Sequence, residues 1–153
     1  MLRIQKILVP TDFSDCSVKA VKYATELASV MKAKLYLLHV AEHSNDGGDP
    51  QSSKYIVPEY ISEVEKQLKD RLNRIANELN LQGVEAQPML VAGRAYADIV
   101  NTAEELGVDL IVIATHGRTG FSHLVFGSTA EKVVRLSPCP VLTVKSQPNP
   151  LAA

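Results

Sequence analysis

The sequence predicts a single α/β domain with a doubly wound, open parallel sheet of five strands. Segments with the apolar pattern of strands alternate with segments of helical periodicity along the chain, which is typical of parallel sheets with right-handed crossovers. The strongest predicted strand, 109–114, is apolar on both faces, as expected of a central strand covered by helices on two sides. The 153 residues suit one core, and the sequence contains no internal repeat.

Two strands and two helices are predicted in the first half of the chain. A β-branched run at 4–9, closed by a proline, predicts a strand, and the helical spacing of apolar residues predicts a helix over about 16–32. Residues 35–40 form a second apolar strand, and the polar stretch 42–57 is typical of a loop. A long helix is expected over about 58–80. Its apolar stripe consists of Ile61, Val64, Leu68, Leu72, Ile75 and Leu79.

The second half adds three strands and two helices. The strand predicted over 84–91 contains Pro88, which removes a backbone donor and indicates a position near an edge of the sheet. The helix predicted over 95–106 has Gly107 as its expected C′ residue. The remaining elements are a strand at 109–114, a helix at 128–137 and a strand at 141–144.

Charge and composition argue against several kinds of partner. The net charge of −1 gives no reason to expect nucleic acid or an anionic membrane as the main partner. No apolar run approaches the ~20 residues that span a bilayer, and the N-terminus leads into a strand rather than resembling a signal peptide. The only cysteines, Cys16 and Cys139, do not form a disulfide framework, so a reducing cytoplasm is the expected location.

Two glycine-containing turns follow the predicted central strand. Ligands of open parallel sheets bind beyond the carboxyl ends of the strands, where the strand order reverses. Gly117 and Gly120 permit positive φ and the close approach of another group. Gly127 and Ser128 stand at the start of a helix, where backbone N–H groups and the helix dipole favour a phosphate. These turns therefore suit a polyphosphate.

A structural interpretation of the same residues remains open. The sequence Ser-Thr-Ala-Glu at 128–131 is a capping box, which would start the helix without any ligand. Gly117 and Gly120 could be turn residues only. The two interpretations are compatible, because a serine oxygen can accept from the helix backbone while its hydroxyl proton points to a phosphate.

Residues 115–120, followed by Gly127 and Ser128, resemble the nucleotide signature of the universal stress protein family. That signature is a glycine, two residues, a second glycine, nine residues, and then a glycine with a serine or threonine. Gly117 and the Gly127–Ser128 pair match it, and Ala114 takes the place of the first glycine. Further likeness, which extends the resemblance to nearly the whole chain, lies in segments 7–14, 38–40 and 137–144.

The resemblance implies an ATP-binding member of that family, with strand order 3-2-1-4-5, a domain at 1–146 and a short tail at 147–153. It implies that Pro10 and Val40 line the adenine, with the Val40 backbone at the base edge, and that Asp12 lies near the nucleotide and its Mg²⁺. AMP or another adenine nucleotide is the alternative ligand. The residues expected at the nucleotide are Pro10, Thr11, Asp12, Val40, Ala114, His116, Gly117, Arg118, Gly120, Gly127, Ser128 and Thr129.

Several of these residues have a structural role as the alternative. Asp12 is also a turn-forming residue before a helix. Arg118 is either a guanidinium fork for phosphate or an exposed loop arginine. His39 and His116 are too few to indicate a metal site, and we expect each of them to be hydrogen-bonded structure.

Other nucleotide-binding classes fit less well. A receiver domain needs an acceptor Asp at the end of the third strand, where the sequence has Leu-Val-Ala-Gly at 90–93. The glycine fingerprint of dinucleotide-binding domains and the lysine of a Walker A loop are missing from the corresponding turns. The strongest rival is an adenine-nucleotide hydrolase or ligase, whose serine- and glycine-rich loop after strand one is missing too. We therefore expect a stress-response module that binds nucleotide, with at most slow ATP hydrolysis.

The strand at 141–144 is the expected interface of a homodimer. In the implied strand order it is an edge strand, it is almost entirely apolar, and its first flanking charge is Lys145. The resemblance implies the same pairing. The alternative is an edge that the tail at 146–153 covers.

Overall fold

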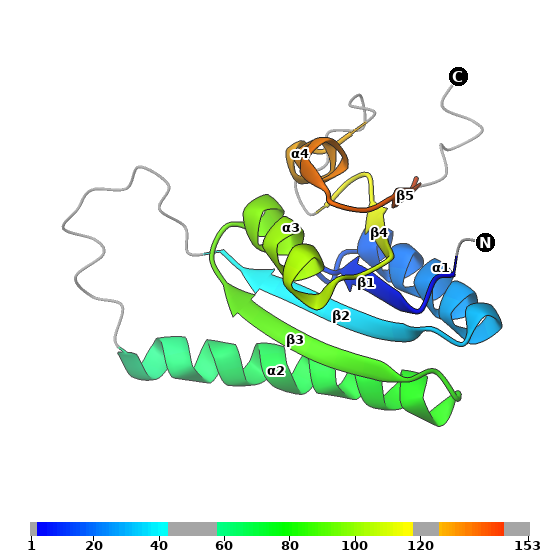
Figure 1. The fold of residues 1–153 in the computed structure, drawn as a ribbon. Helices are drawn as coiled ribbons and strands as arrows, with labels where there is room; N and C mark the ends of the chain where they lie inside the picture. The colour runs from blue at the N-terminus through cyan, green and yellow to red at the C-terminus, as the bar shows by residue number, and fades with distance from the viewer. Residues whose placement is uncertain (1–2, 43–57, 118–125, 146–153) are drawn as a thin grey trace, which may run out of the picture.

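The computed structural model describes residues 3–42, 58–117 and 126–145 (Figure 1). They form one five-stranded sheet in the order β3-β2-β1-β4-β5, and every neighbouring pair is parallel. The predicted fold class and strand order are therefore confirmed. The strands are β1 (Lys6–Pro10), β2 (Lys34–Ala41), β3 (Ala86–Ala92), β4 (Leu110–Ala114) and β5 (Val141–Val144).

Four helices cover the two faces of this sheet (Figure 1). The odd-numbered β1 residues Ile7 and Val9 belong to the core beneath α1 and α2, whereas Leu8 belongs to the core beneath α3 and α4. This alternation follows from the two-residue period of strands, which sends successive side chains to opposite faces. The helices are α1 (Asp15–Met31), α2 (Pro58–Leu81), α3 (Ala95–Leu106) and α4 (Ser128–Leu136).

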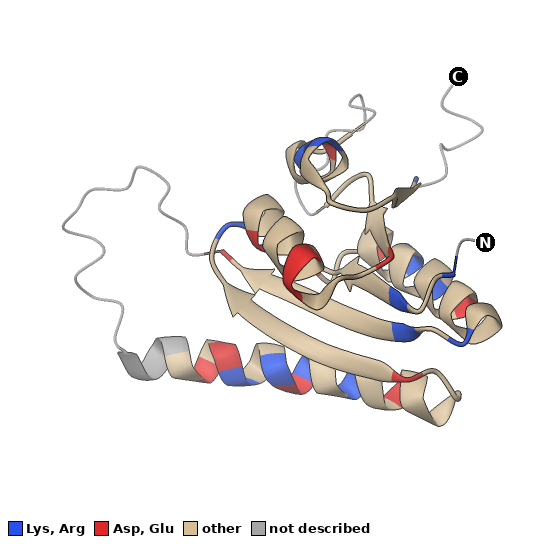
Figure 2. Ribbon diagram, viewed as in Figure 1, with Lys and Arg blue, Asp and Glu red and all other residues tan. Residues whose placement is uncertain are grey.

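The predicted helix and strand ends agree with the structure in most places. Gly107 ends α3 in the left-handed region at φ 57°, as its expected C′ role requires. Pro88 lies in β3, which is an edge strand as predicted. The predicted start of β3 at 84 is too early, because the Val84 N–H still donates to the Leu79 carbonyl at the end of α2. Charges of both signs are interspersed along α2, as expected of a solvated face (Figure 2).

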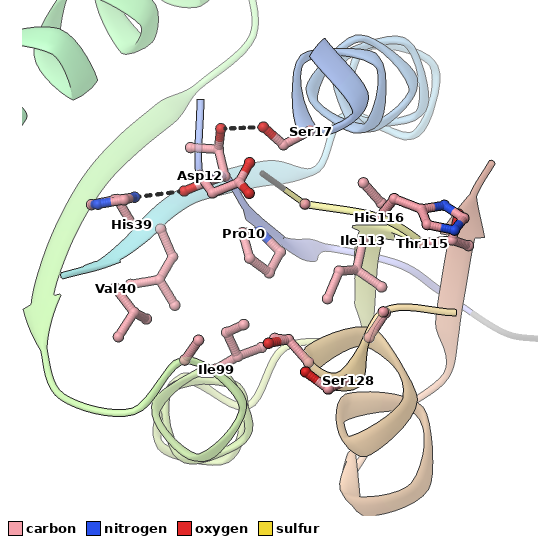
Figure 3. A pocket seen from close by; sticks show the side chains of 18 of the residues that line it. Pro10, Asp12, Ser17, His39, Val40, Ile99, Ile113, Thr115, His116 and Ser128 are labelled. Atoms are coloured by element: carbon pink, nitrogen blue, oxygen red, sulfur yellow. Dashed lines mark hydrogen bonds between the residues drawn. The ribbon is translucent and has the colours of Figure 1, made fainter. Parts of the chain in front are cut away.

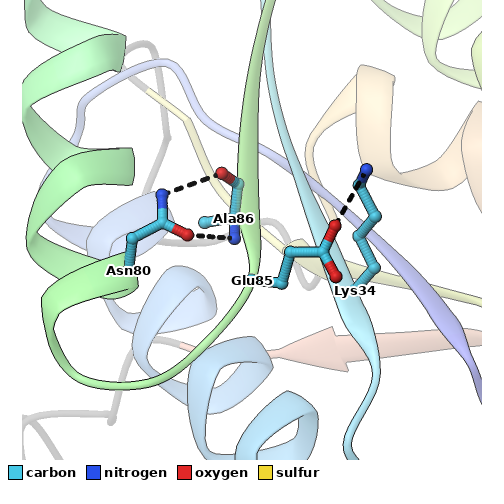
Figure 4. Close-up of polar contacts among 4 residues, drawn as sticks. All are labelled: Lys34, Asn80, Glu85 and Ala86. Carbon is cyan, nitrogen blue, oxygen red and sulfur yellow. Dashed lines mark hydrogen bonds and ion pairs between the residues drawn. The ribbon is translucent and has the colours of Figure 1, made fainter.

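Asn80 joins the last turn of α2 to the first residue of β3 (Figure 4). Its Nδ2 donates to the Ala86 carbonyl (3.1 Å) and its Oδ1 accepts from the Ala86 N–H (3.0 Å). The neighbouring Lys34–Glu85 ion pair (3.1 Å) is largely exposed, and such pairs contribute at most about 1 kcal/mol. The ion pair joins β2 to the residue before β3, so Asn80 is the contact that ties α2 to the start of β3.

Asn80→Ala is expected to lower the free energy of unfolding by about 1–3 kcal/mol, because Ala86 is buried and loses the partners of both its backbone groups. Urea unfolding followed by circular dichroism measures the change. Asn77→Ala, at an exposed position one turn earlier on α2, is the matched control and should stay within about 0.5 kcal/mol of wild type. Equal losses in the two variants would show that the Asn80 bonds do not stabilise the fold.

Candidate functional site

A cavity of about 190 Å³ opens at the carboxyl ends of β1, β2 and β4 (Figure 3). It lies at the point where the strand order reverses between β1 and β4, and α3 and α4 form its other walls. Such a switch point is the general ligand position of open α/β sheets. Within the part of the chain that the structure describes, the lining includes ten of the predicted site residues: Pro10, Thr11, Asp12, Val40, Ala114, His116, Gly117, Gly127, Ser128 and Thr129.

One side of the cavity is apolar. Pro10 ends β1, Val40 lies near the end of β2, and Ile99 faces them from α3 (Figure 3). Ile113 of β4 and the fully buried Leu38 complete this side. A flat aromatic base can bury its faces against such side chains, whereas a charged group would lose its hydration there.

The other side of the cavity is formed by backbone at the start of α4. Gly127 is the N-cap of α4, and its N–H donates to the Thr115 carbonyl (2.6 Å), which ties the turn after β4 to the helix. Ser128, Thr129 and Ala130 follow as the first helical residues and line the cavity. The first turn of a helix has N–H groups without intrahelical acceptors, so this wall offers donors to an anion.

The predicted capping box at 128–131 is wrong. Gly127, in an extended conformation at φ −69° and ψ 157°, occupies the N-cap position, and among the described residues no side chain makes a capping bond to this helix. Ser128 is already helical, so its oxygen cannot cap in the way that the sequence pattern suggested. The Glu131 N–H donates to the Gly127 carbonyl instead (3.0 Å).

Space, rather than backbone conformation, favours glycine at two positions of the site. Neither Gly117 nor Gly127 has positive φ, unlike Gly83 and Gly107. A Cβ on Gly117 would lie 2.6 Å from Asp12 Oδ2, and one on Gly127 would lie 3.2 Å from the Thr115 carbonyl oxygen. Of the two properties that the sequence suggested for Gly117, positive φ and close approach of another group to the backbone, the structure shows the second.

Asp12 combines its turn-forming role with a position at the cavity. Its Oδ1 accepts from both the N–H (3.0 Å) and the hydroxyl of Ser14, which is the N-cap of α1. Its Oδ2 faces Gly117 across the reversal point. The loops after β1 and β4 therefore place a carboxylate beside the glycine turn.

Phe13 holds the loop after β1 in an unusual conformation. Its φ of 64° is rare for a bulky residue, and its N–H donates to Thr11 Oγ1 (3.0 Å). Its ring lies between His39 (4.7 Å between centroids) and the Arg71 guanidinium (4.2 Å from the centroid). His39 Nδ1 in turn donates to the Thr11 carbonyl (2.7 Å; Figure 3). His39 is therefore hydrogen-bonded structure, as predicted.

His116 is hydrogen-bonded, as predicted: its Nδ1 lies 3.0 Å from Thr115 Oγ1. Among the described residues, no group of three or more His, Cys, Asp or Glu side chains is arranged to hold a metal ion. The predicted site residues Arg118 and Gly120 lie outside the described residues.

The described part of the chain contains no helix that is both long and apolar enough to cross a membrane.

Positive charge flanks an aromatic ring where α3 begins, next to the cavity-lining Ala95. Arg94 Nη1 donates to the Tyr96 hydroxyl (3.5 Å), and this hydrogen bond, with the positive charge itself, lowers the pKa of Tyr96 from its usual range. Lys132 Nζ lies 4.6 Å from the centroid of the same ring. The two cations add positive potential on the α3–α4 side of the molecule.

Sequence reasoning missed several lining residues. Ile99 and Ile113 carry only the signal of core residues, because each stands at an apolar position of an amphipathic or buried element. Glu42 and Ala95 were missed as well, since nothing in the sequence indicates that the end of β2 meets the start of α3.

Comparison with known proteins gives a consistent result. The model of the universal stress protein family matches residues 3–145. Universal stress protein MJ0531 of Methanocaldococcus jannaschii is 34% identical over 142 residues, which cover 92% of this chain and 82% of that protein. The solved structure of MJ0577 from the same organism superposes with a TM-score of 0.83 at 30% identity, covering 96% of this chain and 99% of the other.

A universal stress protein from Archaeoglobus fulgidus, solved in complex with dAMP, shares the fold with a TM-score of 0.63. It is 23% identical, and the match covers 95% of this chain and 100% of that one. The family model spans nearly the whole chain, and relatives at about one-third identity cover most of it. The chain belongs to the universal stress protein family.

Proposed function

We propose that the protein is an ATP-binding regulatory module of the cytoplasm, with at most slow hydrolysis of the nucleotide. The observation that carries this proposal is the cavity at the reversal point, which joins an apolar side to the N–H-rich start of α4. The base lies between Pro10, Val40 and Ile99, and the phosphates lie against Gly117, Gly127 and Ser128. AMP or another adenine nucleotide uses the same base position.

The start of α4 offers donors to a phosphate. The Gly127 N–H is bonded to the Thr115 carbonyl, which holds the helix start close to the turn after β4. The N–H groups of the next residues, from Ser128 on, have no intrahelical acceptors, so phosphate oxygens can accept from several of them at once. The proposed ligand thus matches both the glycine spacing and the cavity.

Asp12 is the residue proposed to hold Mg²⁺. A carboxylate beside phosphates repels them unless a cation intervenes, and hard carboxylate oxygens suit Mg²⁺. Asp12 Oδ2 lies beside Gly117 in the turn after β4. Bound Mg²⁺ would neutralise charge between this carboxylate and the phosphate oxygens.

Family membership supports the proposal at a coarser level. The Archaeoglobus protein of the same fold was solved with dAMP, an adenine nucleotide. That protein shows that this architecture accommodates such a ligand, and the proposal extends the same ligand class to the present chain.

Slow turnover separates the proposed function from the rival enzyme. An adenine-nucleotide hydrolase should release phosphate at roughly 1 s⁻¹ or faster in the steady state. The proposed binding module should remain well below that rate with saturating Mg-ATP. Turnover at enzymatic rates would overturn the regulatory assignment while leaving nucleotide binding intact.

Ser128→Ala is expected to weaken ATP about 10- to 150-fold, because a hydrogen bond to a charged group contributes about 1.5–3 kcal/mol. Adenosine affinity should stay unchanged, since adenosine has no phosphate. Ser128 is the first helical residue and not the N-cap, so stability should also be nearly unchanged. Calorimetric titrations measure both affinities.

Ser29→Ala, at an exposed position on α1, is the matched control and should bind both ligands like wild type. Equal weakening of ATP and adenosine by Ser128→Ala would argue against a phosphate at this hydroxyl. Unchanged ATP affinity would remove Ser128 from the proposed site.

A further inference from the structure

Glu42 follows the end of β2 and lines the cavity, but the proposed function leaves it without a role. Its Oε1 accepts from the Ala95 N–H at the start of α3 (2.8 Å). This bond spans 53 positions of sequence and joins the end of β2 to α3 across one wall of the cavity.

The bond directs one oxygen of the exposed Glu42 carboxylate to the start of α3. Arg94, the N-cap of α3, makes no side-chain capping bond, so Glu42 supplies an acceptor that the helix start otherwise lacks on Ala95. A carboxylate offers about four lone-pair sites, and the Ala95 bond uses one of them. The carboxylate thus lies at the cavity with capacity to accept from a ligand.

Glu42 lies at the base side of the cavity rather than at the phosphate side. It stands just beyond the end of β2, lines the same cavity as Val40, and is bonded to Ala95 at the start of α3. Val40 and Ile99 form the apolar wall, and Ala95, the partner of Glu42, is one turn before Ile99 on α3. The N–H groups proposed for phosphate belong to α4, on the opposite side.

We propose that Glu42 selects the purine base by accepting a hydrogen bond from the 6-amino group of adenine. This inference rests on the proposed nucleotide-binding function. Hypoxanthine, the base of ITP, presents an acceptor oxygen in place of the 6-amino donor and has its N1–H at a neighbouring position of the ring, and an ionised carboxylate can only accept. The protein should therefore bind ATP more tightly than ITP.

The expected preference for ATP over ITP is about 10- to 150-fold, the range of one hydrogen bond to a charged acceptor. The measured quantity is the ratio of the two dissociation constants, obtained by calorimetric titration in the presence of Mg²⁺. Because both nucleotides have the same ribose and triphosphate, a general loss of structure or of phosphate binding cancels in this ratio.

Glu42→Gln is the decisive variant. The amide oxygen still accepts from the Ala95 N–H, and the amide nitrogen can donate to a 6-oxo group, so the ratio should fall to within about threefold of unity. Glu42→Ala should also lose the preference. Glu105→Gln makes the same charge change at an exposed position near the end of α3, and it should keep the wild-type ratio.

The outcomes separate the two proposals. If the wild type binds ATP but not in preference to ITP, or if Glu42→Gln keeps the wild-type ratio, base selection by Glu42 is overturned and the nucleotide site stands. If the wild type binds neither nucleotide, the proposed function fails and base selection falls with it. A preference that disappears only in the Glu42 variants supports the inference.

Discussion

Gly127→Asp is expected to weaken ATP binding about 1000-fold or more. The new carboxylate would stand at the N-cap of α4, against the position proposed for the phosphates. Two like charges about 4 Å apart repel by about 4 kcal/mol at the effective dielectric of a protein surface, which corresponds to about three orders of magnitude in affinity. The measurement is a calorimetric titration with Mg-ATP.

The fold should survive this substitution. Gly127 has φ −69°, which any residue adopts, and Asp is a preferred N-cap residue. The added Cβ must settle against the Thr115 carbonyl at 3.2 Å, so we expect stability within about 1 kcal/mol of wild type. Thermal unfolding checks this expectation.

Gly127→Asn is the matched control, because it adds a side chain of nearly the same size without charge. It is also a good N-cap residue. A loss of ATP affinity as large as that of Gly127→Asp would show that shape, and not charge, excludes the ligand. Wild-type affinity in Gly127→Asp would show that no phosphate binds at the start of α4.

Leu142→Lys is expected to convert a homodimer into a monomer. We propose that two copies pair through β5, which is an edge strand of the sheet and exposes 39% of Leu142. A lysine there would place like charges against each other across a two-fold interface. Light scattering at tens of micromolar measures the mass of both forms.

The structure restricts this test to Leu142. Val144 of the same strand is only 7% exposed and packs in the core beneath α1, so a lysine at that position would test folding instead. Leu81→Lys, at the exposed end of α2, makes the same chemical change away from β5 and should remain dimeric. A monomeric wild type, or a dimeric Leu142→Lys variant, would exclude the β5 interface.

The fold was predictable because its signals are local. The stripe of α2, the two-sided apolar strand β4 and the glycine that ends α3 each depend on residues within one element. The edge position of β3 followed from the missing backbone donor of Pro88. The start of β3 was misplaced because the turn around Gly83, at φ 85°, keeps Val84 bonded to α2.

The candidate site was only partly predictable, because it combines segments distant in sequence. The glycine turns and Asp12 have recognisable spacing, but the apolar wall uses residues that look like ordinary core. The capping-box prediction was wrong because the helix begins one residue earlier than that pattern requires. Gly127 is the N-cap, and Ser128 is already inside the helix. The Glu42–Ala95 bond depends on how β2 and α3 meet, which no local pattern encodes.

Equilibrium titration of the wild-type protein with ATP in the presence of Mg²⁺ is the most direct test of nucleotide binding at the cavity. We expect saturable binding at one site per chain with a micromolar or lower dissociation constant, and weaker binding of adenosine, which lacks the phosphates. The absence of saturable binding for ATP, AMP and adenosine up to millimolar concentrations would show that the cavity, with its apolar side and helix N–H groups, is not an adenine-nucleotide site.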